Sequence, residues 1–297
     1  MENKKGRSIE AKQRIAGWTF LAPASIMIGI FSFYPMIQAF ITSFKKGTGL
    51  QMTWVDTPLY NYTRMFKDQI FMTSVKNTFL YLIIQVPVMI ILAMLISVML
   101  NDKNLKFRGF FRTCIFLPCI TSLVAYSIIM KGLFATDGTI NQFLMALHLI
   151  KEPIGWMTDP FWARVLIIIA ITWRWTGYNM IFFLSGLQNI DPSIYEAADI
   201  DGTSAWNTFF QITVPMLKPI ILFTAITSTI GTLQLFDEVV NITGGGPADA
   251  TLSLSQYIYN LSFKYTPDFG KAAAVSFVIV ICVVILSTIQ LKVGNDD

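Results

Sequence analysis

Seven consecutive residues in the second half of the chain combine the side-chain types that bind a sugar. They are Trp173, Arg174, Trp175, Thr176, Gly177, Tyr178 and Asn179. Planar indole rings offer apolar faces to the C–H surfaces of a sugar ring, while hydroxyl, amide and guanidinium groups supply hydrogen bonds. A glycine lets a ligand approach the backbone closely. The segment therefore has the chemistry of a substrate path for a carbohydrate.

Arg174 has a second interpretation, because it lies inside an apolar run. It follows Arg164, which we expect near the outer edge of a membrane, by ten residues. A helix rises about 1.5 Å per residue, so Arg174 would lie roughly 15 Å deep. An arginine at that depth usually faces a cavity or an opposite charge. Arg174 therefore either lines the path, or pairs with Asp237 or Glu238 or snorkels, with the tryptophans packed between helices.

A second set of candidate path residues lies near residue 230. Ser228, Gly231 and Leu235 have the spacing i, i+3 and i+7, which puts them on one helical face with Thr232 beside them. Hydroxyl groups on such a face either join two membrane helices or face a substrate. The spacing alone leaves both alternatives open.

The sequence contains no sign of an enzyme acting alone. It has no Gly-x-x-x-x-Gly-Lys-Ser/Thr phosphate loop and only one histidine, His148. Cys114, Cys119 and Cys282 have neither metal-binding nor redox spacing. We expect no catalytic residues, no metal and no cofactor on this chain. If the protein drives transport with ATP, the ATPase is another polypeptide.

The composition is that of a membrane protein. Of the 297 residues, 54% are hydrophobic and only 13% are charged, whereas a soluble domain has about a quarter charged residues. A spanning helix needs about 20 apolar residues, and six segments qualify. These are 17–44, 76–100, 110–134, 162–188, 216–236 and 272–292. The predicted fold class is an all-α integral membrane protein.

Basic residues predict the orientation, because cytoplasmic loops carry an excess of lysine and arginine. They gather in the N-terminal tail and after the second span, at Lys4, Lys5, Arg7, Lys12, Arg14, Lys103, Lys106, Arg108 and Arg112. Six spans then put both termini inside and the loops 45–75, 135–161 and 237–271 outside. We expect tails at 1–16 and 293–297 and a transmembrane domain at 17–292, with a cytoplasmic loop at 189–215.

The 189–215 loop predicts two short helices that meet at a glycine. Asp191 is a good N-cap and Pro192 suits the first helical position, so a helix should run from Ser193 to Asp201 and end at Gly202. Thr203 or Ser204 should cap a second helix that runs to Gln211, and Pro215 and Pro219 should mark the start of the next span. The loop is acidic where the charge rule expects basic residues, which indicates chemistry directed at a partner.

The spacing in this loop resembles the cytoplasmic signature of ABC-importer permeases. That signature is Glu-Ala-Ala, three residues, Gly, nine residues and Ile-x-Leu-Pro. The chain matches it at Glu196, Ala197, Ala198, Gly202, Ile212 and Pro215, and departs from it at Val214, which replaces leucine. Further segments resemble the maltose- and glycerol-phosphate-type group that takes up carbohydrates, among them 61–68, 107–118 and 243–247. The resemblance runs from about residue 18 to the end and is to the compact six-helix form.

The resemblance implies a type I importer fold with several partners. The protein partners are a second, different permease subunit, two ATP-binding-cassette subunits that hold ATP and Mg²⁺, and an extracytoplasmic sugar-binding protein. The chain is expected in the bilayer of a prokaryotic plasma or inner membrane. No role for nucleic acid is implied. The binding protein is expected to dock on the outer loops, including Gly244–Pro247, which is a flexible turn by composition. It also implies that positions matching Gly177, Tyr178, Asn179 and the face around Thr232 line the sugar site.

The resemblance also makes the 189–215 loop the coupling site for the ATPase. The residues expected to take part are Ile194, Tyr195, Glu196, Ala197, Ala198, Asp199, Gly202, Ile212 and Pro215. The alanines allow close approach, Glu196 offers a carboxylate, and Ile194, Tyr195 and Ile200 would be the apolar anchor. The preferred function is a permease subunit of an ATP-driven di- or oligosaccharide importer. A secondary transporter or facilitator is the alternative, and a structural scaffold is a third.

Overall fold

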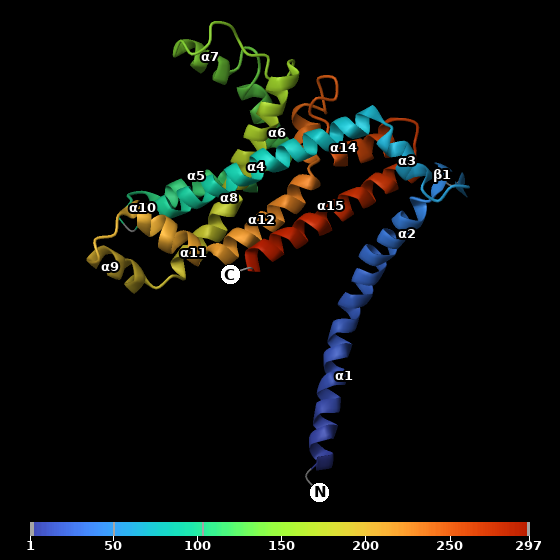
Figure 1. Ribbon diagram of the computed structural model, residues 1–297, viewed down its shortest axis with the longest axis horizontal. Coiled ribbons are helices and arrows are strands. Elements are labelled where there is room, and N and C mark those ends of the chain that lie inside the picture. Colours follow the sequence, from blue (N-terminus) through green and yellow to red (C-terminus); the bar gives the residue numbers. More distant parts are fainter. Residues whose placement is uncertain (1–2, 50, 103, 296–297) are drawn as a thin grey trace. The chain divides into compact units, whose positions relative to one another are not determined.

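The computed structural model describes residues 3–49, 51–102 and 104–295, and its regular structure is almost entirely helical (Figure 1). The expectations for residues 1–2, Lys103 and residues 296–297 lie outside these residues. Within the described chain, four helices are long and apolar enough to cross a membrane, and two bent helix pairs raise the number to six if each pair is one span. This confirms the all-α membrane class.

The chain forms two compact units. The first contains the described parts of Met1–Met65 together with Leu261–Phe277, and the second contains Phe66–Asn260 together with the described parts of Val278–Asp297. The last helix, α15 (Phe269–Asn295), runs through both units.

The first unit begins with the first span. Its elements are α1 (Asn3–Ile28), the π-helical turn η1 (Gly29–Phe33), α2 (Tyr34–Thr42), β1 (Lys45–Thr48), β2 (Gln51–Trp54) and α3 (Tyr60–Phe66). The strands pair antiparallel, with Lys45 opposite Trp54. Asn61 holds the start of the hairpin, because its Nδ2 donates to the carbonyls of Ser43 and Lys45, each at 2.8 Å. Arg64 forms an ion pair with Asp268.

The second unit holds most of the helices. They are α4 (Gln69–Asn101), α5 (Arg108–Ile120), α6 (Leu123–Leu133), α7 (Thr139–Ala146), α8 (Pro160–Gln188), α9 (Pro192–Ile200), α10 (Ala205–Thr208), η2 (Phe209–Thr213), α11 (Val214–Met216), α12 (Lys218–Leu233), α13 (Asp237–Ile242) and α14 (Leu254–Tyr259), followed by η3 (Asn260–Lys264), which continues into the first unit. The two longest, α4 and α8, start at aspartate N-caps, since Asp68 accepts from the Ile70 N–H and Asp159 from the N–H groups of Phe161 and Trp162.

The third predicted span is broken. Helices α5 and α6 meet at an angle of 104°. Pro118 has no N–H for the last turn of α5, and residues 121 and 122 then adopt extended backbone. Ser122 caps α6 by accepting from the Ala125 N–H at 3.3 Å. The segment expected to span at 110–134 is therefore two helices and not one, because a proline and a serine cap together end one helix and start another.

The fifth predicted span is also bent, by 68°. The helix that Ser204 caps continues past the expected end at Gln211, through η2 and α11 to Met216. The bend lies at Leu217. In a regular helix the ring of Pro219 would clash with the carbonyl of residue 215, four residues earlier, so the helix cannot continue straight. Pro215 lies inside the preceding helix and does not end it.

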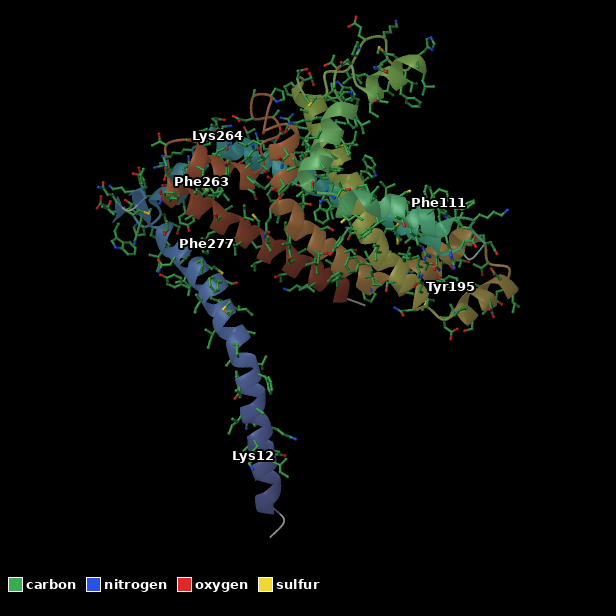
Figure 2. All side chains as sticks on the ribbon, turned by 180° about the vertical axis from the view of Figure 1, so that it is seen from behind. Lys12, Phe111, Tyr195, Phe263, Lys264 and Phe277 are labelled. Atoms are coloured by element: carbon green, nitrogen blue, oxygen red, sulfur yellow. The ribbon has the colours of Figure 1, made fainter. Side chains whose placement is uncertain are left out.

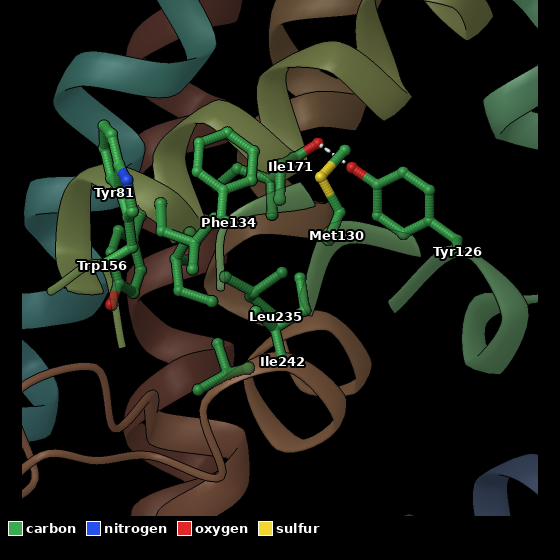
Figure 3. Packing of buried hydrophobic residues seen from close by; sticks show 12 residues of the cluster. Tyr81, Tyr126, Met130, Phe134, Trp156, Ile171, Leu235 and Ile242 are labelled. Carbon is green, nitrogen blue, oxygen red and sulfur yellow. Dashed lines mark hydrogen bonds between the residues drawn. The ribbon is translucent and has the colours of Figure 1, made fainter. Parts of the chain in front are cut away.

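A buried cluster packs α4, α6, α8 and α13 together (Figure 3). Its largest members include Tyr81, Tyr126, Phe134 and Trp156. Each tyrosine hydroxyl finds a backbone acceptor, since Tyr126 donates to the Ala170 carbonyl at 2.6 Å and Tyr81 to that of Thr251 at 3.1 Å. Both of these tyrosine hydroxyls are thus satisfied, because an unpaired polar group is costly in a membrane interior.

The loop that follows α13 is bound by side chains from α4 and α8. Asn77 donates to the carbonyls of Asp249 and Leu252, and Arg164 donates to the carbonyl of Ala250 at 2.8 Å. Thr251 is fully buried and donates to the Gly246 carbonyl at 2.9 Å. Side chains from α4 and α8 thus bind the backbone just beyond the turn at 244–247, and the flexibility expected of the turn itself stays a prediction.

Gly177 lies at a close approach of α5 and α8. A Cβ at this position would lie 2.2 Å from the Ile115 carbonyl oxygen. We expect Gly177→Ala to cost about 1–3 kcal/mol of stability, because two backbones would have to separate. The measurement is the Tm of the purified protein in detergent.

Gly132→Ala in α6 is the matched control for Gly177→Ala. A Cβ there meets no atom within 4 Å, so this variant should keep or slightly raise the Tm, because alanine favours a helix. If both variants melt alike, the close contact at Gly177 is not the reason for its glycine.

Candidate functional site

A cavity of about 200 Å³ lies between α4, α8 and α12. Its lining combines two carboxamides, hydroxyls, aromatic rings and aliphatic groups. The lining residues are Gln85, Met89, Ile171, Trp175, Tyr178, Asn179, Thr227, Ser228, Gly231, Thr232 and Leu235. None of these residues is charged.

The polar groups of the cavity wall are connected to one another. Thr232 Oγ1 donates to Gln85 Oε1 at 3.0 Å, with the Ser228 carbonyl also within reach at 2.8 Å. Gln85 and Asn179 each direct an amide N–H to the sulfur of Met89, at 3.2 and 3.3 Å. Gln85, Asn179 and Thr232 are all buried. The wall therefore offers hydrogen-bonding groups whose positions are already fixed before a ligand arrives.

Two aromatic rings border the same cavity. Trp175 and Tyr178 meet edge to face with ring centroids 5.7 Å apart, and Tyr178 meets Phe182 in the same way at 5.1 Å. Trp175 is 36% exposed and Tyr178 39% exposed, so part of each ring is open to a ligand. Flat rings beside carboxamides and hydroxyls are suited to the alternating apolar and polar surfaces of a sugar.

Seven of the eleven residues expected in the substrate path line this cavity. They are Trp175, Tyr178, Asn179, Ser228, Gly231, Thr232 and Leu235. Trp173 and Thr176 lie elsewhere, on an apolar groove that they share with residues of α4 and α5. A helix turns by about 100° per residue, so seven consecutive residues of α8 cannot all face one side.

Four cavity residues were not predicted, namely Gln85, Met89, Ile171 and Thr227. One signal could have found Gln85, because it is a carboxamide inside the apolar segment 76–100, and a polar residue in a span usually faces the interior. The same signal marks Thr227, a hydroxyl residue in the segment 216–236, whereas Met89 and Ile171 have no distinguishing sequence feature.

Arg174 and Gly177 face α5 and not the cavity. Arg174 is buried and its guanidinium donates to the carbonyls of Pro118, Thr121 and Cys119 at 3.0, 3.3 and 3.3 Å. Its Nε lies 3.9 Å from Glu238 Oε1. The structure thus favours the alternative in which Arg174 pairs with an acid, and adds the carbonyls that the break after α5 leaves open.

The loop at 189–215 has the two-helix form expected from the sequence. Asp191 caps α9 by accepting from the Ser193 N–H at 2.9 Å, and this bond holds the pKa of the Asp191 carboxyl below its usual value. Gly202 ends α9 with φ +70°. The N–H groups of Gly202 and Thr203 donate to the carbonyls of Asp199 and Ala198, which is the Schellman arrangement.

The residues of α9 divide between two faces. Glu196, Ala197, Asp199 and Gly202 are exposed, and Ile200 is 87% exposed.

The other face of α9 belongs to the body of the unit. Ala198 is buried, and Ile194 and Tyr195 pack against a cluster formed by α4, α8, Ile190 and Leu217. Figure 2 labels Tyr195 on this helix. Tyr195 also shares a hydrogen bond with Thr213 at 3.2 Å. Ile194 and Tyr195 are half-buried and attach α9 to its own unit, and their expected role as a docking anchor stays a prediction.

The second coupling helix offers further exposed surface. Ile212 is half-buried and Pro215 is exposed. Trp206 and Phe210 are exposed, with ring centroids 4.7 Å apart. Neither aromatic residue belongs to the signature at 196–215, so the sequence motif did not indicate them.

Within residues 3–49, 51–102 and 104–295, no cluster of three or more histidine, cysteine, aspartate or glutamate side chains could hold a metal ion. The absence of a bound cofactor on this chain stays a prediction.

Apolar spans, and a cavity between them whose wall contains carboxamides and hydroxyls, are typical of a membrane transport protein. The family model described as the binding-protein-dependent transport system inner membrane component matches residues 71–293. The chain belongs to this family, and is thus a multi-pass permease component of a binding-protein-dependent transport system.

Relatives and solved structures agree with this assignment. The chain is 54% identical to the lactose transport system permease protein of Rhizobium radiobacter, over 97% of each chain. It is 33% identical to the arabinooligosaccharides transport system permease protein of Bacillus subtilis, over 97% of this chain and 91% of the relative. A bacterial ABC transporter involved in the import of the acidic polysaccharide alginate has the same fold, with a TM-score of 0.83, 22% identity and coverage of 96% and 97% of the two chains.

Replacing Arg174 tests its role at the break between α5 and α6. We expect Arg174→Leu to lower the Tm by several degrees, because three buried carbonyls lose a donor and each unsatisfied group costs about 1–3 kcal/mol. Arg108→Leu, at an exposed position where α5 begins, is the control and should melt like the wild type. An unchanged Tm for Arg174→Leu would show that these carbonyls find other donors.

Proposed function

We propose that this chain is one of two different permease subunits of an ATP-driven importer of a neutral di- or oligosaccharide. The observation that carries the proposal is the cavity between α4, α8 and α12, where aromatic rings stand beside carboxamides and hydroxyls. In this proposal the cavity is half of the translocation pathway, and the second permease supplies the other half.

The cavity's chemistry supports a neutral substrate. An acidic sugar buried in a membrane protein needs a basic partner, because an unpaired charge is expensive to bury. The lining described above contains no lysine or arginine, and Arg174 is turned toward α5. The names of the lactose and arabinooligosaccharide relatives point to the same substrate class.

The energy source is inferred from two features. The chain contains no phosphate-binding loop, and α9 presents an exposed face that includes Glu196, Ala197 and Ile200. We assign this face to a groove on one of two ATP-binding-cassette subunits, which hold ATP and Mg²⁺. In this assignment, the coupling residues lie on the cytoplasmic side together with both termini of the chain, in a prokaryotic plasma or inner membrane. The chain itself is a transport subunit and not an enzyme.

A sugar-binding protein delivers the substrate in this proposal. The loops at 45–75 and 135–161 and the turn at 244–247 are its docking surface. The side-chain bonds from Asn77 and Arg164 to the segment 249–252 support this role, because a pre-organised loop loses little conformational entropy on binding. The permease then alternates between outward- and inward-facing states as the motor subunits close and open.

The function is tested by purifying the chain with its partners. A tagged chain extracted from its native cells in mild detergent should bring a second permease and an ATPase, identified by mass spectrometry. In proteoliposomes with the sugar-binding protein, this complex should take up lactose or arabinotriose only when ATP is present, and should not take up digalacturonate. A chain that purifies alone and takes up lactose with a proton gradient would instead be a secondary transporter.

The coupling role predicts the effect of changing Gly202. Valine disfavours the left-handed conformation that Gly202 adopts, with φ +70°, whereas asparagine tolerates it. We expect Gly202→Val to reduce sugar-stimulated ATP hydrolysis by about tenfold or more, because a strain of 1–3 kcal/mol would displace the end of α9. Gly202→Asn is the control and should retain most of the activity. Equal activities would contradict the role assigned to this turn.

A further inference from the structure

Glu238 is a buried carboxylate that the sequence motifs leave without a role. It lies in the first turn of α13, and it is only 4% exposed. Its Oε1 accepts a hydrogen bond from the indole Nε1 of Trp175 at 3.2 Å. The same oxygen lies 3.9 Å from the Nε of Arg174. One carboxylate oxygen therefore serves two consecutive residues of α8 that face different sides.

Trp175 connects this carboxylate to the cavity. Its indole ring borders the cavity and is 36% exposed. A tryptophan side chain has two rotatable bonds, and an open cavity on one side leaves its ring plane poorly fixed by packing alone. A hydrogen bond from Nε1 fixes both bonds, because it requires the N–H to point at one place. Stacking against a sugar ring requires such a defined plane.

Arg174 connects the same carboxylate to the broken third span. Its guanidinium is bound to the carbonyls of Pro118 and Thr121, and its Cζ lies 5.3 Å from the ring centroid of Tyr126 in α6. It is therefore held on both sides of the break. A helix C-terminus such as that of α5 carries partial negative charge and favours a cation there. Arg174 therefore holds a positive charge 3.9 Å from the Glu238 carboxylate oxygen.

We propose that Glu238 is a positioning residue for the cavity, which sets the plane of the Trp175 ring and ties it through Arg174 to the break between α5 and α6. The inference rests on the proposed function for its meaning in transport, but the arrangement itself is independent of the substrate. A movement at the break would move Arg174, and with it the carboxylate that orients the ring. The shape of the cavity and the bend of the third span would then change together.

The transport test uses the assembled importer in proteoliposomes, with lactose delivered by the sugar-binding protein. Glu238→Ala should raise the KM for uptake about tenfold with a smaller change in the maximal rate, because a hydrogen bond to a charged group is lost. Glu238→Gln keeps an oxygen acceptor for the indole and should restore the KM to within about threefold of the wild type. A merely structural role would lower the maximal rate and leave the KM unchanged.

A double variant separates positioning from a general loss of packing. Trp175→Phe keeps a ring but loses the N–H, and it should raise the KM as Glu238→Ala does. Combined, the two changes should raise the KM no further than either alone, because both remove the same bond. Additive effects would overturn the proposal. Asp237→Ala, at the exposed neighbouring carboxylate, is the matched control and should keep the wild-type KM.

A spectroscopic test is independent of the transported sugar. In protein labelled with ¹⁵N-tryptophan, the Trp175 indole resonance is the one that Trp175→Phe removes. Glu238→Ala should shift this resonance and speed its hydrogen exchange, whereas Asp237→Ala should do neither. An unshifted resonance would overturn the positioning role. A wild-type complex that takes up no sugar would contradict the proposed function, and the resonance would still decide the role of Glu238.

Discussion

A backbone carbonyl inside a membrane has no water to bind, so it needs a donor from the protein. In the third span several carbonyls lack a donor from the helix itself, because the chain turns by 104° between α5 and α6. The turn removes the helical partners of the last carbonyls of α5, and Arg174 supplies the donors. The buried arginine is thus explained by the break. The break in turn requires α8 to lie close to α5, which the glycine at 177 makes possible.

The different faces of helix α8 contact different parts of the protein. One face holds α5 through Arg174 and Gly177, and another carries Trp175 and Tyr178 into the cavity. A third borders the apolar groove with Trp173. Glu238 contacts residues on two of these faces. Its Oε1 accepts a hydrogen bond from Trp175 and lies 3.9 Å from the Nε of Arg174. The side chain of Glu238 therefore connects the cavity to Arg174, which binds the carbonyls at the break between α5 and α6.

The coupling loop is attached to the same body by ordinary packing. Ile194 and Tyr195 of α9 lie against a cluster that includes Met180 and Phe183 of α8. Those two residues follow Trp175 and Tyr178 on the same helix. The inner face of α9 and the helix that forms the cavity wall therefore belong to one packed cluster.

Local sequence determined much of this protein. Aspartate before proline and a later glycine fix α9 and its ends, since caps act within one turn. The apolar runs fix the spans because a bilayer demands about 20 such residues. The presence of polar side chains at 173–179 and around Thr232 marked two of the three cavity helices, and the match to the permease signature indicated the family.

Tertiary structure decided which of those side chains meet. Helical rotation sends Arg174 and Gly177 away from the cavity, and the degree of that rotation relative to α5 cannot be read from residue types. Gln85 and Thr232 are 147 residues apart in sequence and come together only when α4 packs beside α12. The same holds for Glu238, whose two partners lie on α8. Hydrogen bonds between distant segments depend on how whole helices pack. The residue pattern of one segment does not specify which other segment it packs against, so these bonds could not be predicted from the sequence.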